Sequence, residues 1–403
     1  MTADIKDLDT ERKRRQDDKD IDYREKIRAH KLSVFIRTTL ALAVFIIIII
    51  VANNVWKDRN LSKVTVQTSV PVSLVTGTTA RNLAGSLFIY SKDGASCVDE
   101  KGKAIWNESF EMQSPLVSIC EGCVAIGDYN GREIYVANNK QILGTIRTTL
   151  PIRSVSVSGN GVVAAVLDDS DVIRIYVYDG NTDTSEPIVQ AKATMNKSGY
   201  PIGVSLSPNG KLMMVSYFFV DSGSMKSSVS FYNFGEVGSN KVDNFVSGFD
   251  YADTVLPYVQ FLNNDAAFGL SNERAVFFSG SEVPDNVGIA MFSGKAVSTF
   301  HNNEYVGIMY PNTTGDGLYR LETYDAKGNK LSEIPVNFDY TDVLYNNDQV
   351  VIYGGNDCMI YTVRGTERYN GKLESNINLL VPTTSQYKYQ VITSDAMETV
   401  LFE

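Results

Sequence analysis

The sequence has few of the residues on which most small catalytic or metal sites depend. Among its 403 residues there are two His, four Cys and two Trp. Two His leave little material for His-based catalysis or zinc binding, and four Cys are too few for a disulfide-stapled scaffold. Basic residues are also in the minority, because 37 Lys and Arg face 47 Asp and Glu. The net charge of −10 argues against nucleic acid as a partner.

Strand-forming and turn-forming residues are common by contrast. The chain holds 30 Gly, 22 Tyr and 18 Phe, and 43% of its residues are hydrophobic. Aromatic side chains favour strands, and Gly favours the tight turns that connect them. The composition therefore predicts a globular protein built from many short strands.

One long apolar run lies near the N-terminus. Residues 32–55 contain a single charge, Arg37, and include five consecutive Ile at 46–50. A helix over the uncharged residues 38–56 would measure about 28 Å, which matches the hydrocarbon core of a bilayer. Five consecutive Ile have no polar face, so a core helix of a soluble protein is disfavoured. We therefore predict that residues 32–56 form a transmembrane helix whose partner is the lipid bilayer.

The charges that flank this run predict its orientation. Five basic residues lie close to it on the N-terminal side and three on the C-terminal side. They are Arg24, Lys26, Arg28, Lys31 and Arg37, followed by Lys57, Arg59 and Lys63. The positive-inside rule then places the N-terminus in the cytoplasm. No Ala-x-Ala cleavage site follows the run, so we predict an uncleaved, single-pass signal anchor in the plasma membrane, with the C-terminal domain extracytoplasmic.

Residues 1–31 form the predicted cytoplasmic tail. Acidic and basic residues are mixed along it and few residues are apolar, so it cannot bury a core of its own. Two interpretations stay open: a solvated tail, or a short charged helix that contacts a cytoplasmic partner or anionic lipid. Residues 57–63 form a predicted short linker.

An apolar strand recurs along the rest of the chain. Its eight copies begin at Ser86, Cys123, Val162, Leu212, Ala266, Tyr305, Gln349 and Tyr389, in steps of 37 to 54 residues. A turn precedes each copy and a strand of alternating residues follows it, as in residues 173–178. This period and this order of parts are typical of four-stranded propeller blades. We predict an all-β β-propeller over residues 64–403.

The blade count depends on how the ring closes. Eight blades result if residues 377–402 supply three strands of the last blade and residues 64–67 supply its outermost strand, which removes the exposed sheet edges. Seven blades result if residues 387–402 instead complete the first blade. We favour eight.

Several motifs resemble those of known families. Residues 97–106, with the sequence CVDEKGKAIW, resemble the blade repeat of quinoprotein (PQQ-type) propellers, and SPNGK at 207–211 is similar to a turn of several propeller families. Segments similar to one particular family are 106–115, 199–202, 215–217 and 231–238. That family is domain of unknown function 5711, an uncharacterised family of Gram-positive (Firmicutes) proteins. Its members join one N-terminal membrane span to an extracytoplasmic propeller. The resemblance covers nearly the whole chain and implies this fold and topology, but no activity.

Two cysteines have the C-x-x-C spacing. Cys120 and Cys123 are expected at a strand–turn–strand junction and do not open a helix that would lower a thiol pKa. No second pair exists for zinc. We interpret them as a fortuitous pair beside a hairpin turn, either reduced or closing a local disulfide.

Two acidic turns and one histidine are the remaining candidates for a metal or catalytic site. Residues 179–183 alternate oxygen donors as calcium loops do, but Thr184 and Gln190 stand where an EF-hand needs Gly and Glu. Residues 168–171 have the same two interpretations, and an ordinary blade turn is favoured for both. His301 is expected in a turn, with no nucleophile assigned to it. The sequence therefore assigns no catalytic, cofactor-binding or metal residue, and no cofactor is expected.

The function that these features favour is a binding or scaffold module at the cell envelope, with a protein or glycan partner. The alternative is a quinoprotein-like dehydrogenase, although Trp106 is the only Trp beyond the membrane segment that could serve as a cofactor platform. The steps of 50 and 54 residues mark two enlarged blades, whose extra length we assign to loops. Candidate partner-binding aromatics in these loops are Phe218, Phe219, Phe245, Phe249 and Tyr251. The competing interpretation is that they pack over the blade edge.

Overall fold

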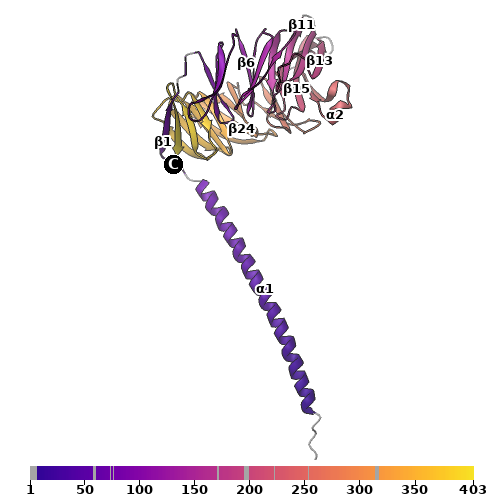
Figure 1. The fold of residues 1–403 in the computed structure, drawn as a ribbon, viewed down its shortest axis with the longest axis vertical. Coiled ribbons are helices and arrows are strands. Elements are labelled where there is room, and N and C mark those ends of the chain that lie inside the picture. Colours follow the sequence, from indigo (N-terminus) through magenta and orange to yellow (C-terminus); the bar gives the residue numbers. More distant parts are fainter. Residues whose placement is uncertain are drawn as a thin grey trace, which may run out of the picture. The chain divides into compact units, whose positions relative to one another are not determined.

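A computed structural model describes residues 7–57, 60–72, 74–75, 77–169, 172–194, 199–221, 223–252, 254–313 and 317–403. The chain divides into two compact units, Met1–Asn60 and Leu61–Glu403. The first unit consists of one helix, and the second contains the β-sheets (Figure 1).

Helix α1 (Asp7–Lys57) is continuous because no Gly or Pro interrupts it. Within it, Lys26–Ile49 are long and apolar enough to cross a membrane. The hydroxyls of the two threonines in this segment form hydrogen bonds inside the helix. That of Thr38 donates to the carbonyl of Val34 at 3.0 Å, and that of Thr39 donates to the carbonyl of Phe35 at 2.9 Å. Such internal bonds suit a helix in lipid, where no water is present to take them.

The second unit is an eight-bladed β-propeller, because 32 strands in its described residues form eight antiparallel sheets of four. Blade 1 contains β2 (Thr79–Leu83), β3 (Ser86–Tyr90), β4 (Gly94–Val98) and β5 (Ala104–Ser109); blade 2 contains β6 (Pro115–Cys120), β7 (Cys123–Asp128), β8 (Glu133–Asn138) and β9 (Ile142–Arg147). Blade 3 contains β10 (Ile152–Val157), β11 (Val162–Asp169), β12 (Val172–Asp179) and β13 (Val189–Thr194). Blade 4 contains β14 (Tyr200–Leu206), β15 (Leu212–Asp221), β16 (Ser224–Asn233) and β17 (Phe245–Tyr251), with the short helices α2 (Glu236–Ser239) and η1 (Val242–Asn244) before β17.

The remaining blades repeat the same order. Blade 5 contains β18 (Tyr258–Phe261), β19 (Ala266–Leu270), β20 (Arg274–Ser279) and β21 (Asp285–Met291); blade 6 contains β22 (Ser298–His301), β23 (Tyr305–Pro311), β24 (Tyr319–Asp325) and β25 (Lys330–Val336). Blade 7 contains β26 (Asp342–Asn346), β27 (Gln349–Gly354), β28 (Asp357–Thr362) and β29 (Glu367–Lys372). Blade 8 contains β30 (Leu379–Pro382), β31 (Lys388–Ile392), β32 (Ala396–Phe402) and β1 (Val64–Pro71).

Blade 8 closes the ring as predicted for eight blades. Its outer strand β1 pairs with β32 from Val64 opposite Phe402 to Pro71 opposite Ala396, so strands from both ends of the propeller share one sheet. Figure 1 shows β1 beside the C-terminal strands. Leu61, just before β1, is buried, and its N–H donates to the carbonyl of Arg368 in blade 7. The seven-blade alternative is wrong.

The core lies between neighbouring blades. The recurring apolar strands of the sequence are the second strands of the eight blades, and strands such as β27 and β19 are buried along their full length. They are continuous apolar runs because a neighbouring blade covers each face. Between blades 4 and 5, for example, Phe231 packs against Phe261 and Phe278 with ring centroids 6.2 and 5.2 Å apart. Blade-to-blade packing thus fixes the first strands around the centre of the ring.

Candidate functional site

The first strands of all eight blades surround one cavity of about 840 Å³. We call it the central channel; its wall is formed by residues of β2, β6, β10, β14, β18, β22, β26 and β30, with Tyr90 and Tyr353 from the second strands. Its volume falls within the range of pockets that hold small molecules. Because successive side chains of a strand point to opposite sides, each first strand can bury one set of residues between blades and leave the other beside the channel.

Three serines of the first strands join neighbouring blades. Each hydroxyl oxygen accepts a hydrogen bond from a backbone N–H on the first strand of the next blade. The bonds run from Val157 to Ser118 (3.0 Å), from Leu206 to Ser156 (3.0 Å) and from Phe261 to Ser205 (2.9 Å). These hydroxyls are therefore engaged in holding blades 2 to 5 together.

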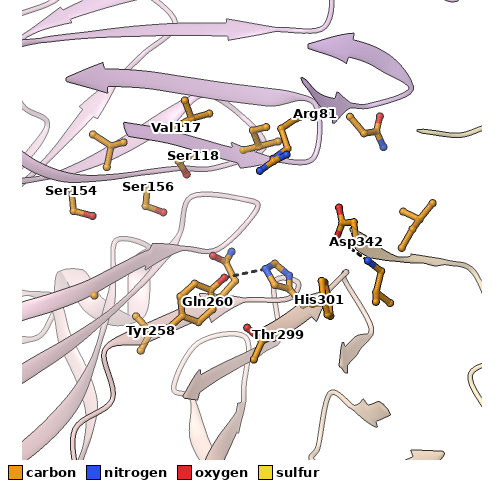
Figure 2. A pocket seen from close by; sticks show the side chains of 18 of the residues that line it. Arg81, Val117, Ser118, Ser154, Ser156, Tyr258, Gln260, Thr299, His301 and Asp342 are labelled. Carbon is orange, nitrogen blue, oxygen red and sulfur yellow. Dashed lines mark hydrogen bonds between the residues drawn. The ribbon is translucent and has the colours of Figure 1, made fainter. Parts of the chain in front are cut away.

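Blades 5 and 6 meet at a polar pair inside the channel. The hydroxyl of Tyr258 lies 3.1 Å from Nε2 of His301 (Figure 2). The His301 ring faces the channel, but the surrounding protein keeps most bulk water away from it. This desolvation lowers the pKa of His301 to about 4, and a hydrogen bond with the Asn302 backbone raises it by a smaller amount. Burial also raises the pKa of Tyr258 to about 12. At neutral pH the pair is uncharged and can exchange hydrogen bonds with a polar ligand.

Two charged side chains also enter the channel. Arg81 extends from β2, and Asp342 opens β26 (Figure 2). Oδ1 of Asp342 accepts a hydrogen bond from the backbone N–H of Val343 at 2.8 Å, and Nη1 of Arg81 donates to the carbonyl of Ala80 at 3.1 Å. Burial raises the pKa of Asp342, although the Val343 bond and the charge of Arg81 both act to lower it. Over the described residues, no ion pair joins Arg81 to Asp342.

Tyr353 lies close to both charges. It stands opposite Asp342 in the β26–β27 register, is buried, and accepts a hydrogen bond from the backbone N–H of Leu380 at 3.4 Å. Burial and the charge of Asp342 raise the pKa of Tyr353, whereas the charge of Arg81 lowers it. The charges of Arg81 and Asp342 both act on the Tyr353 hydroxyl. The two side chains therefore border the same part of the channel, on opposite sides of blade 8.

The aromatics predicted in enlarged loops lie in strands instead. Phe218 and Phe219 belong to β15, and Phe245, Phe249 and Tyr251 belong to β17, the outer strand of blade 4. The extra length of this blade is taken up by the ten-residue strands β15 and β16 and by α2 and η1. The assignment of these residues to loops is therefore corrected.

Two of the β17 aromatics pack against blade 5. The ring of Phe249 lies 5.5 Å from that of Phe278, and the hydroxyl of Tyr251 accepts a hydrogen bond from Asn286 at 3.1 Å. Phe245 is 45% exposed although its ring contacts Tyr232. Of the five aromatics, Phe245 thus presents the most open surface for a partner.

The cysteine pair occupies the predicted hairpin. Cys120 ends β6 and faces Cys123 at the start of β7, across a two-residue turn in which Glu121 has φ +51°. Both are free thiols. Burial, followed by the nearby Glu121 charge, raises the pKa of Cys120 to about 12 and also raises that of Cys123. Neither thiol is activated as a nucleophile.

The acidic turns form internal bonds. Asp179 accepts from the backbone of Asn181 at 3.0 Å, and Asp183 accepts from the backbone of Thr145 at 2.8 Å. Asp168 pairs with Arg153, and Asp169 pairs with Arg174 at 2.5 Å. The other two residues of the second motif, Ser170 and Asp171, lie outside the described residues. Within the described part of the chain, no three metal-ligating side chains come together.

The sequence reasoning missed the channel residues. It placed His301 in a turn, but this residue ends strand β22 and faces the channel. It did not single out Arg81, Tyr258 or Asp342. A usable signal exists: each of these residues lies in the short segment just before a recurring apolar strand. A large polar residue there occupies the innermost strand of a blade.

Comparison with known proteins supports the fold. A model of a family of unknown function, DUF5711, matches residues 57–402, so the chain belongs to this family. Among curated proteins, none matches the sequence. The computationally designed protein Ika8 is similar in structure, with a TM-score of 0.51 and 10% identity over 86% of this chain and 100% of that chain.

Two bacterial structures are also similar. BamB from Moraxella catarrhalis has a TM-score of 0.46 and 12% identity over 84% of this chain and 100% of its own. AztD from Citrobacter koseri has a TM-score of 0.46 and 11% identity over 79% of this chain and 87% of its own. At such identities the likeness is one of fold alone.

Proposed function

We propose that this member of the DUF5711 family is a membrane-anchored, extracytoplasmic propeller that acts as a binding module at the envelope of a Gram-positive (Firmicutes) cell. Its α1 segment Lys26–Ile49 has the length and apolar character of a membrane span. The excess of basic residues before this segment supports a cytoplasmic N-terminus. In this proposal residues 1–31 are a charged cytoplasmic tail, residues 32–56 the signal anchor and residues 57–63 a linker to the propeller at 64–403.

The topology is tested by cysteine labelling in intact cells. In a chain whose four native cysteines are replaced by Ala, Gln16→Cys should resist a membrane-impermeant maleimide, and Ser239→Cys should react. Both positions are exposed, so burial does not account for a difference between them. Labelling of Gln16→Cys but not of Ser239→Cys would show that the orientation is the reverse of the one proposed.

The observation that carries the binding function is the central channel. The fold engages Ser118, Ser156 and Ser205 in inter-blade bonds, whereas the charged pair Arg81 and Asp342 and the His301–Tyr258 pair keep hydrogen-bonding capacity toward the cavity. A cavity of about 840 Å³, whose wall carries these polar groups beside apolar side chains such as Val117 and Ile202, has the volume of a small-ligand site. We infer that the channel holds the ligand.

The channel is tested by blocking it. Ser154 lines the cavity from β10, and over the described residues its hydroxyl forms no hydrogen bond within the protein. Ser154→Trp should fill the channel and abolish saturation-transfer NMR signals from a mixture of amino acids, short peptides, sugars and small carboxylates. Ser239→Trp, at an exposed position, is the control. Signals that survive Ser154→Trp in a protein of unchanged melting temperature would place the ligand elsewhere.

A protein or glycan partner at the outer surface is a second part of the proposal. The five aromatics Phe218, Phe219, Phe245, Phe249 and Tyr251 stay proposed contact residues, with Phe245 the most exposed of them. Chemical crosslinking in intact cells followed by mass spectrometry should identify envelope neighbours. Phe245→Ser should weaken a crosslink through blade 4 and leave the melting temperature almost unchanged, because its side chain is already half exposed. Undiminished crosslinking would remove blade 4 from the interface.

A quinoprotein-like dehydrogenase is the alternative function, and the described residues fit it poorly. Trp106 is buried between blades 1 and 2, and its Nε1 donates to the carbonyl of Asn138 at 2.7 Å. It therefore does not offer a face to a planar cofactor in the channel. The discriminating measurement is the ultraviolet–visible spectrum after reconstitution with quinone and metal, where a metal-dependent cofactor band would restore this alternative.

A further inference from the structure

The channel wall carries one positive and one negative side chain. Of the described residues that line it, Arg81 is the only Lys or Arg and Asp342 the only Asp or Glu. They come from blades 1 and 7, on either side of blade 8. Figure 2 shows both side chains directed into the open channel.

Neither charge forms an ion pair within the described part of the chain. Arg81 donates to a backbone carbonyl of its own strand, and one oxygen of Asp342 accepts from the next residue of its own strand. Elsewhere in the propeller, half-buried arginines do have acidic partners, as in the Arg153–Asp168 and Arg174–Asp169 pairs. In the described part of the chain, Oδ2 of Asp342 has no protein partner.

Asp342 is half-buried and loses hydration without a partner for its Oδ2, which costs free energy, whereas Arg81 is exposed in the channel and free to bind an anion there. A ligand with complementary charges removes this cost when it binds, and it gains hydrogen bonds in surroundings where they are strong. A guanidinium prefers a carboxylate, which it can bind through two N–H groups. A carboxylate such as Asp342 accepts hydrogen bonds from the three N–H groups of an ammonium.

We propose that the channel binds a small zwitterion, an α-amino acid or a short peptide with free termini, with its carboxylate at Arg81 and its ammonium at Asp342. The proposal rests on the proposed function, in which the channel is the ligand site. The His301–Tyr258 pair and Gln260 offer hydrogen bonds to the body of the ligand, and apolar residues such as Val117 and Ile202 offer packing. The cavity has room for more than a single amino acid.

The test uses the full chain in lipid nanodiscs and a probe series of increasing charge separation: glycine, glycylglycine and triglycine. At least one member should bind in isothermal titration calorimetry, and either N-acetylation or C-amidation of that member should weaken binding by about tenfold or more. Arg81→Gln and Asp342→Asn should each have an effect of the same size. Arg147→Gln and Asp357→Asn make the same charge changes at exposed ion pairs outside the channel and should leave binding unchanged.

The pH dependence of binding gives a second readout. Burial raises the pKa of Asp342, and only the ionised carboxylate attracts an ammonium, so affinity should fall as the pH is lowered through that pKa. This loss of affinity should be present in the wild type and smaller in Asp342→Asn. A structural role for Asp342 alone would not produce this difference.

The outcomes separate this proposal from the proposed function. If N-acetylglycinamide, which carries no charge, binds as well as the zwitterions and Ser154→Trp abolishes its binding, the channel is a ligand site but the zwitterion proposal is overturned. If neither charged nor uncharged probes bind, both are overturned. Loss of binding in Arg81→Gln and Asp342→Asn, with the two control variants unaffected, supports both.

Discussion

Two arcs of the channel wall use polar side chains in different ways. In the serine arc, blades 2 to 5, the hydroxyls of Ser118 and Ser156 in the wall, and of the fully buried Ser205 behind it, accept backbone hydrogen bonds from the next blade. In the charged arc, blades 6 to 8 and 1, Arg81 and Asp342 bond only within their own strands and point into the cavity. Polar side chains of the first strands therefore either stabilise the ring or remain available to a ligand.

Both arcs depend on closure of the ring, so removal of β1 should have the largest effect. A fragment that begins at Val72 lacks the outer strand of blade 8 and exposes the edge of β32. It should aggregate and melt several degrees below a fragment that begins at Leu61. The measurement is scanning calorimetry with light scattering. Equal melting of the two fragments would show that β1 is not needed for closure.

Loss of a hydroxyl from the serine arc should have the next largest effect. Ser205 is fully buried, and Ser205→Ala would leave the N–H of Phe261 without its partner, at a cost of about 1–3 kcal/mol in the free energy of unfolding. Denaturant unfolding measures this cost. Ser154→Ala is the matched control, because no bond to Ser154 is lost, and it should change stability by less than about 0.5 kcal/mol. Ser205 is fully buried and does not line the cavity, so zwitterion binding should survive Ser205→Ala. Loss of binding in a variant that still folds would contradict this expectation.

His301 should make stability depend on pH. Its pKa is lowered to about 4 in the fold, against an ordinary value of 6.5, so the unfolded chain binds more protons between these values. This contribution to stability is present above pH 6.5 and is lost as pH falls toward 4. Melting temperatures over this range should decline less in His301→Gln than in the wild type. Parallel curves would mean that the His301 ring is not desolvated in the channel.

Asp342→Asn should give the smallest change in stability, and in the opposite direction. The raised pKa of Asp342 means that its ionised form is disfavoured in the fold, so its contribution is fully present below the unfolded pKa and is lost as pH rises from that value through the raised pKa of the folded state. At neutral pH the variant should be as stable as the wild type or slightly more stable, while it loses the ligand. Destabilisation at neutral pH would assign Asp342 to the structure of the ring.

The blade architecture was predictable because it repeats. The second strand of each blade is a continuous apolar run, and its eight starting residues, from Ser86 to Tyr389, were identified within one residue of the observed strands. The closing strand β1 was predictable because the last blade otherwise lacked a fourth strand. Burial on both faces leaves a strong hydrophobic signal in the sequence.

The channel was not predictable because its residues do not repeat. Arg81 and Asp342 belong to different blades, and the first strands that carry them have only five residues each. Nothing in a single blade shows which other blades place side chains in the same cavity. The aromatics of blade 4 were placed in loops for a related reason: a long step between repeats does not distinguish longer strands such as β15 from an inserted loop.

The most direct test of the different roles of the two arcs is a crystal structure of the protein with the tightest-binding member of the glycine series. The ligand carboxylate should lie within hydrogen-bonding distance of the Arg81 guanidinium, and its ammonium should contact Oδ2 of Asp342, with the three serine bonds intact. A ligand seated against Ser118 and Ser156, or bound outside a channel that contains only water, would contradict the account.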